Sequence, residues 1–301
     1  MRLGIVLSGG VAKGAYQAGF LKAFEKLYGR DNISCVSGAS IGALNGYAFC
    51  ADKTEHIYDI WKSIHFDSVS DVMHNVWFHH FLSDSVHSIV SENDELKIPL
   101  YVPICYYPIV HLNYCRLYGK YNKKWYNFMR GAISFPFIAG APKFFNGQPV
   151  IDGGAMDNIP ILPLVKGERP DMIIVLHFSA GFRPRKILLD DGIPIVDFDV
   201  SITNKFRKHS FDFHNQTISS MLESGEKYAE EIYGNIFENA ETLEELLKRA
   251  SVQTEKESDE RFNNYTFETW VDRLNEVFYP FLRHDGSNLK DISSKQKKKR
   301  N

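Results

Sequence analysis

The hydrophobic pattern of the N-terminal part predicts strands that alternate with helices. Residues 3–7 (LGIVL) and 33–36 (ISCV) are short, nearly continuous apolar runs, which is the pattern of strands buried on both faces of a sheet. Residues 15–28 repeat apolar side chains near helical spacing, and residues 41–50 are small and apolar enough for a buried helix. This alternation predicts βαβ units with a parallel sheet.

The middle of the chain continues the alternation. Residues 99–108 and 109–117 are rich in strand-forming residues and are expected to be adjacent strands. A short strand is expected at 150–151, and Asn158 is expected to cap a helix that starts at residues 159–160, because proline suits a first helical turn. Further helices are expected at 53–64 and 123–134, and further strands at 171–178 and 194–200.

The composition changes near residue 213, and this change sets the predicted domain organisation. Residues 213–250 and 262–282 have the apolar spacing of helices. Residues 293–301 contain a cluster of lysines and are expected to form a disordered tail. The chain is therefore divided into an α/β domain at 1–212, a helical part packed on it at 213–292, and a basic tail at 293–301.

Composition and charge exclude several kinds of protein. The 301 residues have a net charge of -2, so there is no basic field that suggests nucleic acid. The four cysteines lie in apolar runs without zinc-binding spacing and are expected to be reduced core residues. The N-terminus lacks a signal-peptide pattern, and no apolar run is long enough to cross a membrane. We therefore expect a cytoplasmic protein whose membrane contact, if it has one, is peripheral; the oligomeric state stays open.

The stretch around Ser40 has the pattern of a nucleophile elbow. Gly38, Ser40 and Gly42 form a Gly-x-Ser-x-Gly sequence between a predicted strand and a predicted helix. A sharp strand-to-helix turn strains the backbone of the serine, and the flanking glycines remove Cβ atoms that would clash there. The serine hydroxyl then lies above a helix N-terminus, where backbone N–H groups favour developing negative charge. Glycine and serine are common residues, so this five-residue pattern can also arise by chance. The alternative is a glycine-rich turn with an incidental serine.

A glycine-rich loop at residues 8–14 (SGGVAKG) follows the first predicted strand. Such a loop can turn several backbone N–H groups toward one point, as an oxyanion requires. In a parallel sheet it lies at the same edge as the turn around Ser40. A dinucleotide or phosphate loop is the competing interpretation. The spacing of Gly9, Gly10 and Gly14 fits neither Gly-x-Gly-x-x-Gly nor a P-loop that ends in Gly-Lys-Ser/Thr.

Asp152 is the candidate base for the Ser40 hydroxyl. It follows the short strand predicted at 150–151 and begins the sequence Asp152-Gly153-Gly154. This context places a carboxylate at the end of a strand, with room for a substrate or for a close backbone. The alternative is a plain turn aspartate, because Asp-Gly sequences are common in turns.

Together, the three motifs resemble those of the patatin-like phospholipase family. That family has a glycine-rich loop ending in Arg/Lys-Gly, then Gly-x-Ser-x-Gly, then Asp-Gly-Gly or Asp-Gly-Ala, in the order found here. Residues 15–19 (AYQAG) and 158–160 (NIP) also look like the family's surroundings of these motifs, and the resemblance covers about residues 1–180. One departure is Val11, which stands where the family has a third glycine and restricts the loop through its β-branched side chain.

The resemblance implies a three-layer α/β/α fold with a mainly parallel central sheet, followed here by a helical C-terminal part. It implies a Ser40–Asp152 dyad without a catalytic histidine, which cleaves the acyl ester of a phospholipid or another lipid ester. Lys13 matches the family's basic loop position, and we assign it to anchoring of the loop or attraction of lipid head groups. No metal or other cofactor is implied. The implied site residues are the catalytic Ser40 and Asp152, the oxyanion-hole residues Gly9, Gly10 and Val11, the loop residues Lys13 and Gly14, and the motif glycines Gly38, Gly42, Gly153 and Gly154.

Two other functions remain as alternatives. The first is a hydrolase or acyltransferase with a triad, whose base comes from His177, His209 or His214. The second is a catalytically silent scaffold or lipid-binding protein, although the intact Ser40 and Asp152 argue against it. Two stretches also allow a lipid-related interpretation. Residues 72–90 fit a helix packed on the core or a lid near the site, and the basic cluster at 295–300 fits binding to anionic lipid or an inert solvated tail.

Overall fold

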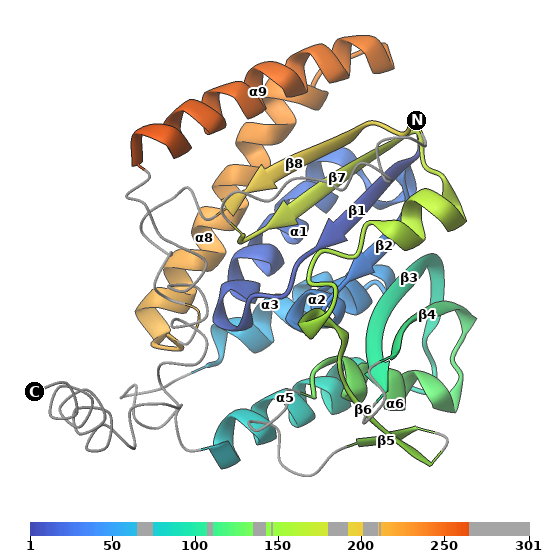
Figure 1. The fold of residues 1–301 in the computed structure, drawn as a ribbon. Helices are drawn as coiled ribbons and strands as arrows, with labels where there is room; N and C mark the ends of the chain where they lie inside the picture. The colour runs from blue at the N-terminus through green and yellow to red at the C-terminus, as the bar shows by residue number, and fades with distance from the viewer. Residues whose placement is uncertain are drawn as a thin grey trace, which may run out of the picture. The chain divides into compact units, whose positions relative to one another are not determined.

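The computed structural model describes residues 1–64, 75–106, 111–134, 143–145, 147–179, 192–200, 210 and 212–264 (Figure 1). Residues Met1–Glu260 form one compact unit, and Arg261–Asn301 form a second. Several predictions therefore lie outside the described residues. They are the helix expected at 262–282 beyond Asn264, the basic tail at 293–301, and His209 as a candidate base.

A mainly parallel sheet forms the centre of Met1–Glu260 (Figure 1). Its described strands are β1 (Leu3–Leu7), β2 (Ile33–Gly38), β3 (Glu95–Tyr106), β4 (His111–Lys120), β5 (Lys143–Phe145), β6 (Gln148–Asp152), β7 (Met172–His177) and β8 (Ile195–Asp199). They lie in the order β5-β6-β3-β2-β1-β7-β8, with β4 paired to β3. The run from β3 to β8 is parallel, and β4, β5 and β6 pair antiparallel. This arrangement confirms the predicted α/β fold.

Strand β3 is long enough to pair with two strands along one of its edges. Tyr101 pairs with Ser37 of β2, and Ile104 pairs with Asp152 of β6. Because Tyr101 and Ile104 both pair with β4 as well, β2 and β6 share the edge of β3 that is opposite β4. The C-terminal ends of β2 and β6 therefore meet on that edge. This register brings the turn that follows Gly38 next to Asp152.

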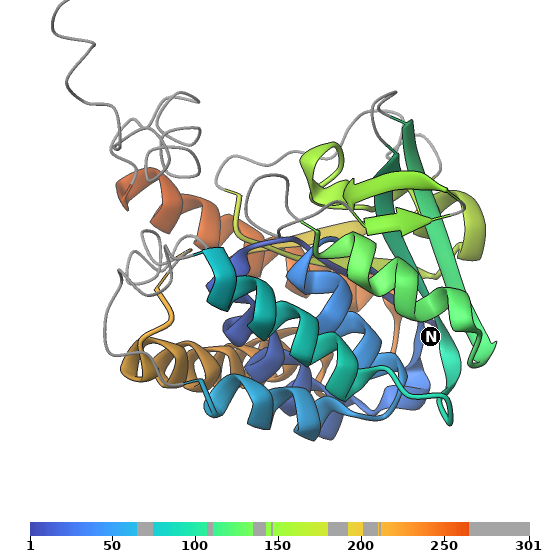
Figure 2. The ribbon, with the colours of Figure 1, turned by 90° about the horizontal axis from the view of Figure 1, so that it is seen from below.

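Helices cover one face of the sheet and form the larger core with it. Leu3, Ile5 and Leu7 of β1 are fully buried beneath these helices, as expected for a central strand. Figure 2 shows several of the helices side by side, drawn in blue to green. Their bounds are α1 (Gly14–Tyr28), α2 (Ile41–Cys50), α3 (Thr54–Lys62), α5 (Asn75–Ile89), α6 (Lys123–Ala132) and α8 (Asn215–Ile232).

The contact between α1 and α8 depends on two glycines. A Cβ on Gly19 would lie 2.0 Å from the carbonyl oxygen of Leu222, and one on Gly225 would lie 2.1 Å from that of Tyr16. The backbones of the two helices therefore touch directly. A short helix (Tyr233–Phe237) and α9 (Leu243–Asn264) follow α8. Among the described helices, none combines the length and the apolar character needed to span a membrane.

The other face of the sheet is covered by the chain that follows β6. Val6 and Cys35 face this side and pack with Leu164 and Val165. The predicted helix cap at Asn158 is wrong: the helical stretch here is the short Leu164–Glu168, which has Pro163 at its N-terminus. The Asn158 side chain instead reaches the loop after β1, where it donates a hydrogen bond to the Gly9 carbonyl. All four cysteines of the chain are free and buried, as predicted.

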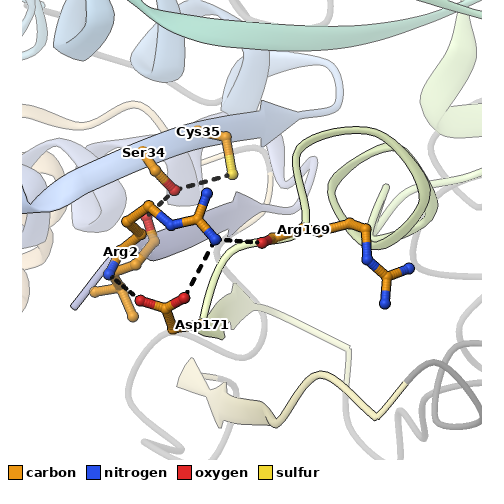
Figure 3. Close-up of polar contacts among 6 residues, drawn as sticks. Arg2, Ser34, Cys35, Arg169 and Asp171 are labelled. Carbon is orange, nitrogen blue, oxygen red and sulfur yellow. Dashed lines mark hydrogen bonds and ion pairs between the residues drawn. The ribbon is translucent and has the colours of Figure 1, made fainter.

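Polar contacts at the N-terminal ends of the strands fasten β1 to its neighbours (Figure 3). The backbone N–H of Arg2 donates to Oδ2 of Asp171 at 2.7 Å, and its guanidinium donates to the Arg169 carbonyl at 3.0 Å. On the other side, the Ser34 hydroxyl donates to the Leu3 carbonyl at 3.2 Å. These contacts lie at the end of β1 opposite the glycine loop, so they hold the strand without entering the candidate site.

Candidate active site

Ser40 lies in a sharp turn between β2 and α2, as the elbow pattern predicts. Its backbone has φ 53° and ψ −126°, a conformation that residues with a side chain rarely adopt. Such a backbone costs on the order of 1–3 kcal/mol and persists only where its surroundings enforce it. The residue is 9% exposed, so its hydroxyl lies in a nearly enclosed site.

Close backbone contacts require both motif glycines. A Cβ on Gly38 would lie 2.4 Å from the carbonyl oxygen of Gly42, and one on Gly42 would lie 2.6 Å from that of Leu7. Both distances are shorter than real Cβ contacts, so a larger residue would push β1, β2 and α2 apart. The Gly-x-Ser-x-Gly spacing is therefore a packing requirement of the turn that holds Ser40.

Asp152 ends β6 and is fully buried next to the Ser40 turn. Its Oδ1 accepts a hydrogen bond from the Gly154 N–H at 2.7 Å, which fixes the carboxyl group. A Cβ on Gly153 would lie 2.3 Å from the carbonyl carbon of Pro103, so this glycine lets the turn lie tightly against β3. The Asp-Gly-Gly sequence thus supplies both a carboxylate and the tight turn that aims it.

Burial raises the pKa of the Asp152 carboxyl to about 7, although the Ser40 hydroxyl and the Gly154 N–H each lower it. A carboxyl with this pKa is suited to take up and return a proton near neutral pH. Its Oδ2 has no partner among the described residues that meets full hydrogen-bond geometry. The contact with Ser40 is therefore looser than a formed hydrogen bond, and catalytic contacts commonly tighten only when substrate binds.

The glycine loop lies against Ser40. A Cβ on Gly9 would lie 3.0 Å from the Cβ of Ser40, so the two backbones approach closely. The Gly9 N–H donates to the Asn158 carbonyl at 3.3 Å, whereas the N–H groups of Gly10 and Val11 make no hydrogen bond within the described chain. Val11 has φ 52°, a conformation that the family's third glycine would adopt without strain.

A buried polar network, which sequence reasoning missed, supports the loop. Gln17 Nε2 donates to the Ser8 carbonyl at 2.8 Å, and Asn45 Nδ2 donates to the Gly14 carbonyl at 2.8 Å. Trp61 Nε1 donates to Asn45 Oδ1 at 3.1 Å. The network fixes both ends of the loop through side chains of α1, α2 and α3. Its signal in the sequence was a single polar residue within each of two otherwise apolar stretches, AYQAG and GALNG.

Lys13 and Gly14 close the loop. Lys13 is 7% exposed, and this burial suits anchoring of the loop better than contact with lipid head groups. A Cβ on Gly14 would lie 2.5 Å from the Ile41 side chain, so glycine allows α1 to begin against the start of α2. Gly14 therefore connects the glycine loop to the helix that follows Ser40.

A small apolar pocket, with a volume of about 10 Å³, lies beside Ser40. The predicted helix within 72–90 is confirmed as α5, and two of its residues border this pocket. Among the described lining residues Ser40 is the one with a hydroxyl, so an apolar chain in the pocket would end at the serine. The other lining residues come from segments far apart in the sequence: Val11, Ile41, Trp61, Phe81, Leu82, Ile133 and Phe213.

The described candidate histidines have other partners than Ser40. His177 is buried at the end of β7, with Nε2 3.3 Å from Oδ2 of Asp197. His214 has Nδ1 2.7 Å from Oδ1 of Asp212. No hydrogen bond joins either histidine to Ser40 within the described residues, and β1 separates β7 from β2. The same part of the chain contains no group of three or more His, Cys, Asp or Glu residues that could hold a metal ion.

Comparison with known proteins supports the motif analysis. The family model of the patatin-like phospholipases matches residues 5–97, which include the glycine loop and Ser40 but not Asp152. No curated protein matches the chain. Two solved structures are similar at 13% identity: VipD from Legionella pneumophila, and the complex of SpcU with ExoU from the type III secretion system of Pseudomonas aeruginosa.

Both structural matches cover most of this chain and have low TM-scores. The first covers 74% of this chain and 67% of the VipD chain with a TM-score of 0.40. The second covers 86% of this chain and 59% of the other with a TM-score of 0.33. The family model is the stronger finding, because it matches the part of the chain that contains two of the three motifs. The match therefore confirms, over residues 5–97, the resemblance to patatin-like phospholipases that the motifs indicate.

Proposed function

We propose that this protein cleaves fatty-acyl ester bonds of glycerophospholipids with a Ser40–Asp152 dyad and releases free fatty acid and lysolipid. The observation that supports this most is the close approach of two residues that are far apart in the sequence. A strained, nearly enclosed serine lies next to a buried carboxyl whose pKa is raised to about 7. Perturbed carboxyls in contact with a hydroxyl are typical of sites that move protons.

The first step transfers the acyl group to Ser40. As the Ser40 oxygen attacks the ester carbonyl carbon, its proton passes to ionised Asp152. The carbonyl oxygen becomes an oxyanion, for which the N–H groups of Gly10 and Val11, unpaired within the described residues, are the proposed donors. The N–H of Gly9 is engaged by Asn158, so we assign this glycine to close packing against Ser40. Collapse of the intermediate breaks the ester bond, and Asp152 returns the proton to the departing lysolipid oxygen.

The second step releases the fatty acid. Water enters after the lysolipid has left, and Asp152 takes its proton while the water oxygen attacks the acyl-serine carbonyl. The same N–H groups hold the second oxyanion. When this intermediate collapses, the serine oxygen regains a proton from Asp152 and the fatty acid departs. The dyad is thereby restored without a net change in protons on the enzyme.

The small apolar pocket beside Ser40 supports an apolar acyl group as the group that lies next to the serine. Its walls are aliphatic and aromatic, so burial of each methylene group of a bound chain is favourable by about 0.8 kcal/mol. A charged or strongly hydrated acyl group would lose its hydration there without replacement. A phospholipid substrate also brings the enzyme to a membrane surface during turnover, in keeping with peripheral membrane contact.

Lipid analysis of a serine variant tests the proposal. Mixed phospholipid vesicles are incubated with wild type, with Ser40→Ala, and with Ser251→Ala as a matched control for an exposed serine on α9. We expect free fatty acid and lysolipid from wild type and from the control, and none from Ser40→Ala. The Ser40→Ala protein should stay folded, because the change deletes a hydroxyl only. Equal fatty-acid release by Ser40→Ala, or no release by wild type and no labelling of Ser40 by a fluorophosphonate, would overturn the proposal.

A further inference from the structure

Asn158 joins the glycine loop to the segment that follows Asp152. Its Nδ2 donates a hydrogen bond to the Gly9 carbonyl at 3.2 Å, and its own backbone carbonyl accepts the Gly9 N–H at 3.3 Å. Both polar groups of Gly9 are therefore held by one residue that lies 149 positions away in the sequence. Asn158 thus makes contacts that a helix cap would not require.

The side chain of Asn158 also fits against two glycines of the site. A Cβ on Gly9 would lie 2.3 Å from Asn158 Oδ1, and one on Gly154 would lie 3.1 Å from the same atom. Gly154 is the residue whose N–H holds the Asp152 carboxyl. One amide group therefore touches the backbone of the glycine loop and the backbone of the turn that fixes the base.

The hydrogen bond to the Gly9 carbonyl also fixes the direction of the next N–H group. The peptide unit between Gly9 and Gly10 is planar and trans, so its C=O and N–H point in opposite directions. With the oxygen held by Asn158, the Gly10 N–H must point away from the Asn158 amide. That N–H makes no hydrogen bond within the described chain, so it is available to an incoming group.

The sequence of the loop makes such a restraint necessary. Glycine tolerates both signs of φ, so a peptide plane between two glycines can rotate by half a turn at little steric cost. Rotation of the Gly9–Gly10 plane would present a carbonyl oxygen in place of the N–H group. An oxyanion would then meet negative partial charge where it needs a donor.

We infer that Asn158 is a positioning residue, which locks the Gly9–Gly10 peptide so that the Gly10 N–H faces the oxyanion formed on attack by Ser40. This inference rests on the proposed Ser40–Asp152 function. It assigns to Asn158 no contact with substrate and no proton transfer. Loss of the lock should lower stabilisation of the tetrahedral intermediates and leave substrate binding and the base unchanged.

Two variants test the lock, with turnover of a soluble short-chain ester as the readout. Asn158→Ala removes the amide, and Asn158→Asp keeps its size but places a carboxylate oxygen against the Gly9 carbonyl. Loss of one oxyanion donor costs about 10²–10³ in kcat, so incomplete loss of its alignment should lower kcat by roughly 10- to 100-fold in both variants. KM should stay unchanged in both variants, because the acyl pocket is not altered. The inflection of the pH profile should stay unchanged in Asn158→Ala, whereas the added carboxylate of Asn158→Asp lies near Asp152 and should raise it.

A transition-state analogue separates positioning from general damage. A trifluoromethyl ketone forms a hemiketal oxyanion with Ser40, whereas an ether analogue of the substrate binds without one. The inhibition constant of the ketone should rise in parallel with the loss of kcat, and that of the ether should not change. Asn122→Ala is the matched control: it removes the Asn122 cap of α6, which lowers stability but should leave kcat intact.

The outcomes distinguish this inference from the proposed function. Wild-type kcat in folded Asn158→Ala and Asn158→Asp would overturn the lock and leave the dyad standing. In Asn158→Ala, a shifted pH inflection or a raised KM with unchanged kcat would also overturn it, because each places the effect on the base or on substrate binding. If Asn158→Ala does not fold, Asn158→Asp decides alone, since it preserves the volume at this position. An inactive wild type would instead refute the proposed function.

Discussion

Replacement of Asp152 by asparagine should abolish turnover and at the same time stabilise the fold at neutral pH. An amide cannot accept the proton of Ser40, so the first step loses its base. The amide has nearly the volume of the carboxyl, and its oxygen can still accept the Gly154 N–H bond. The variant also removes a carboxyl that is fully buried and therefore costly to ionise.

The size of the stabilisation follows from the pKa of Asp152. The carboxyl ionises near 3.8 in the unfolded chain and at about 7 in the folded protein. A difference of about three pKa units corresponds to about 4 kcal/mol. Between these two pH values the folded protein retains a proton that the unfolded chain has released. The stability of wild type therefore falls as the pH rises from about 4 to about 7, and this loss is complete above that range.

Asparagine at position 152 has no proton to lose, so the difference in stability between the two proteins should depend on pH. The free energy of unfolding of Asp152→Asn should exceed that of wild type by about 4 kcal/mol at about pH 8, and by almost nothing near pH 4. Urea unfolding at a series of pH values measures the difference. Asp59→Asn, which removes an exposed carboxylate on α3, is the control and should give a difference that hardly changes with pH.

Two results would contradict this reasoning. A stability difference that is the same near pH 4 and near pH 8 would show that Asp152 does not ionise at a raised pH in the folded protein. Substantial turnover by folded Asp152→Asn would show that another group takes the serine proton. The two measurements are independent: unfolding tests the raised pKa of Asp152, and turnover tests its role as the base.

Two further predictions concern the base. For a soluble ester, kcat/KM should rise about tenfold per pH unit below pH 7 and level off above it, because Asp152 must be ionised; a profile that stays flat down to about pH 5 would contradict the pKa near 7. This inflection overlaps that of an unperturbed histidine near 6.5, so substitution must separate the two kinds of base. His177→Gln and His214→Ala should keep most of their kcat/KM when folded, whereas a loss of several orders of magnitude in either would favour a triad.

Local sequence sufficed for most of the elements and for the turn that holds the serine. Strands such as Leu3–Leu7 and Ile33–Gly38 could be predicted because a strand buried on both faces must be apolar throughout. The turn at Ser40 could be predicted because its strain and the contact of Gly38 with Gly42 arise within a few residues of the chain, although the contact of Gly42 with Leu7 depends on the packing of β1. The role of Asp152 was suggested by its motif, although nothing near it in sequence shows which residue it would meet.

The pairing of Asp152 with Ser40, by contrast, was decided by the register of β3. One edge of that strand receives β2 and then β6, and this choice depends on the packing of the whole sheet. The raised pKa of Asp152 has the same origin, because burial is a property of the assembled domain.

Tertiary structure also decided the role of Asn158. Its sequence context, next to a proline, suggested a helix cap, since capping is a local interaction. In the folded chain its amide reaches Gly9, a contact that only the packing of the segment after β6 against the loop after β1 can make. Hydrogen bonds between residues 149 positions apart leave no periodic trace in a sequence, so the lock on the glycine loop becomes visible only in the fold.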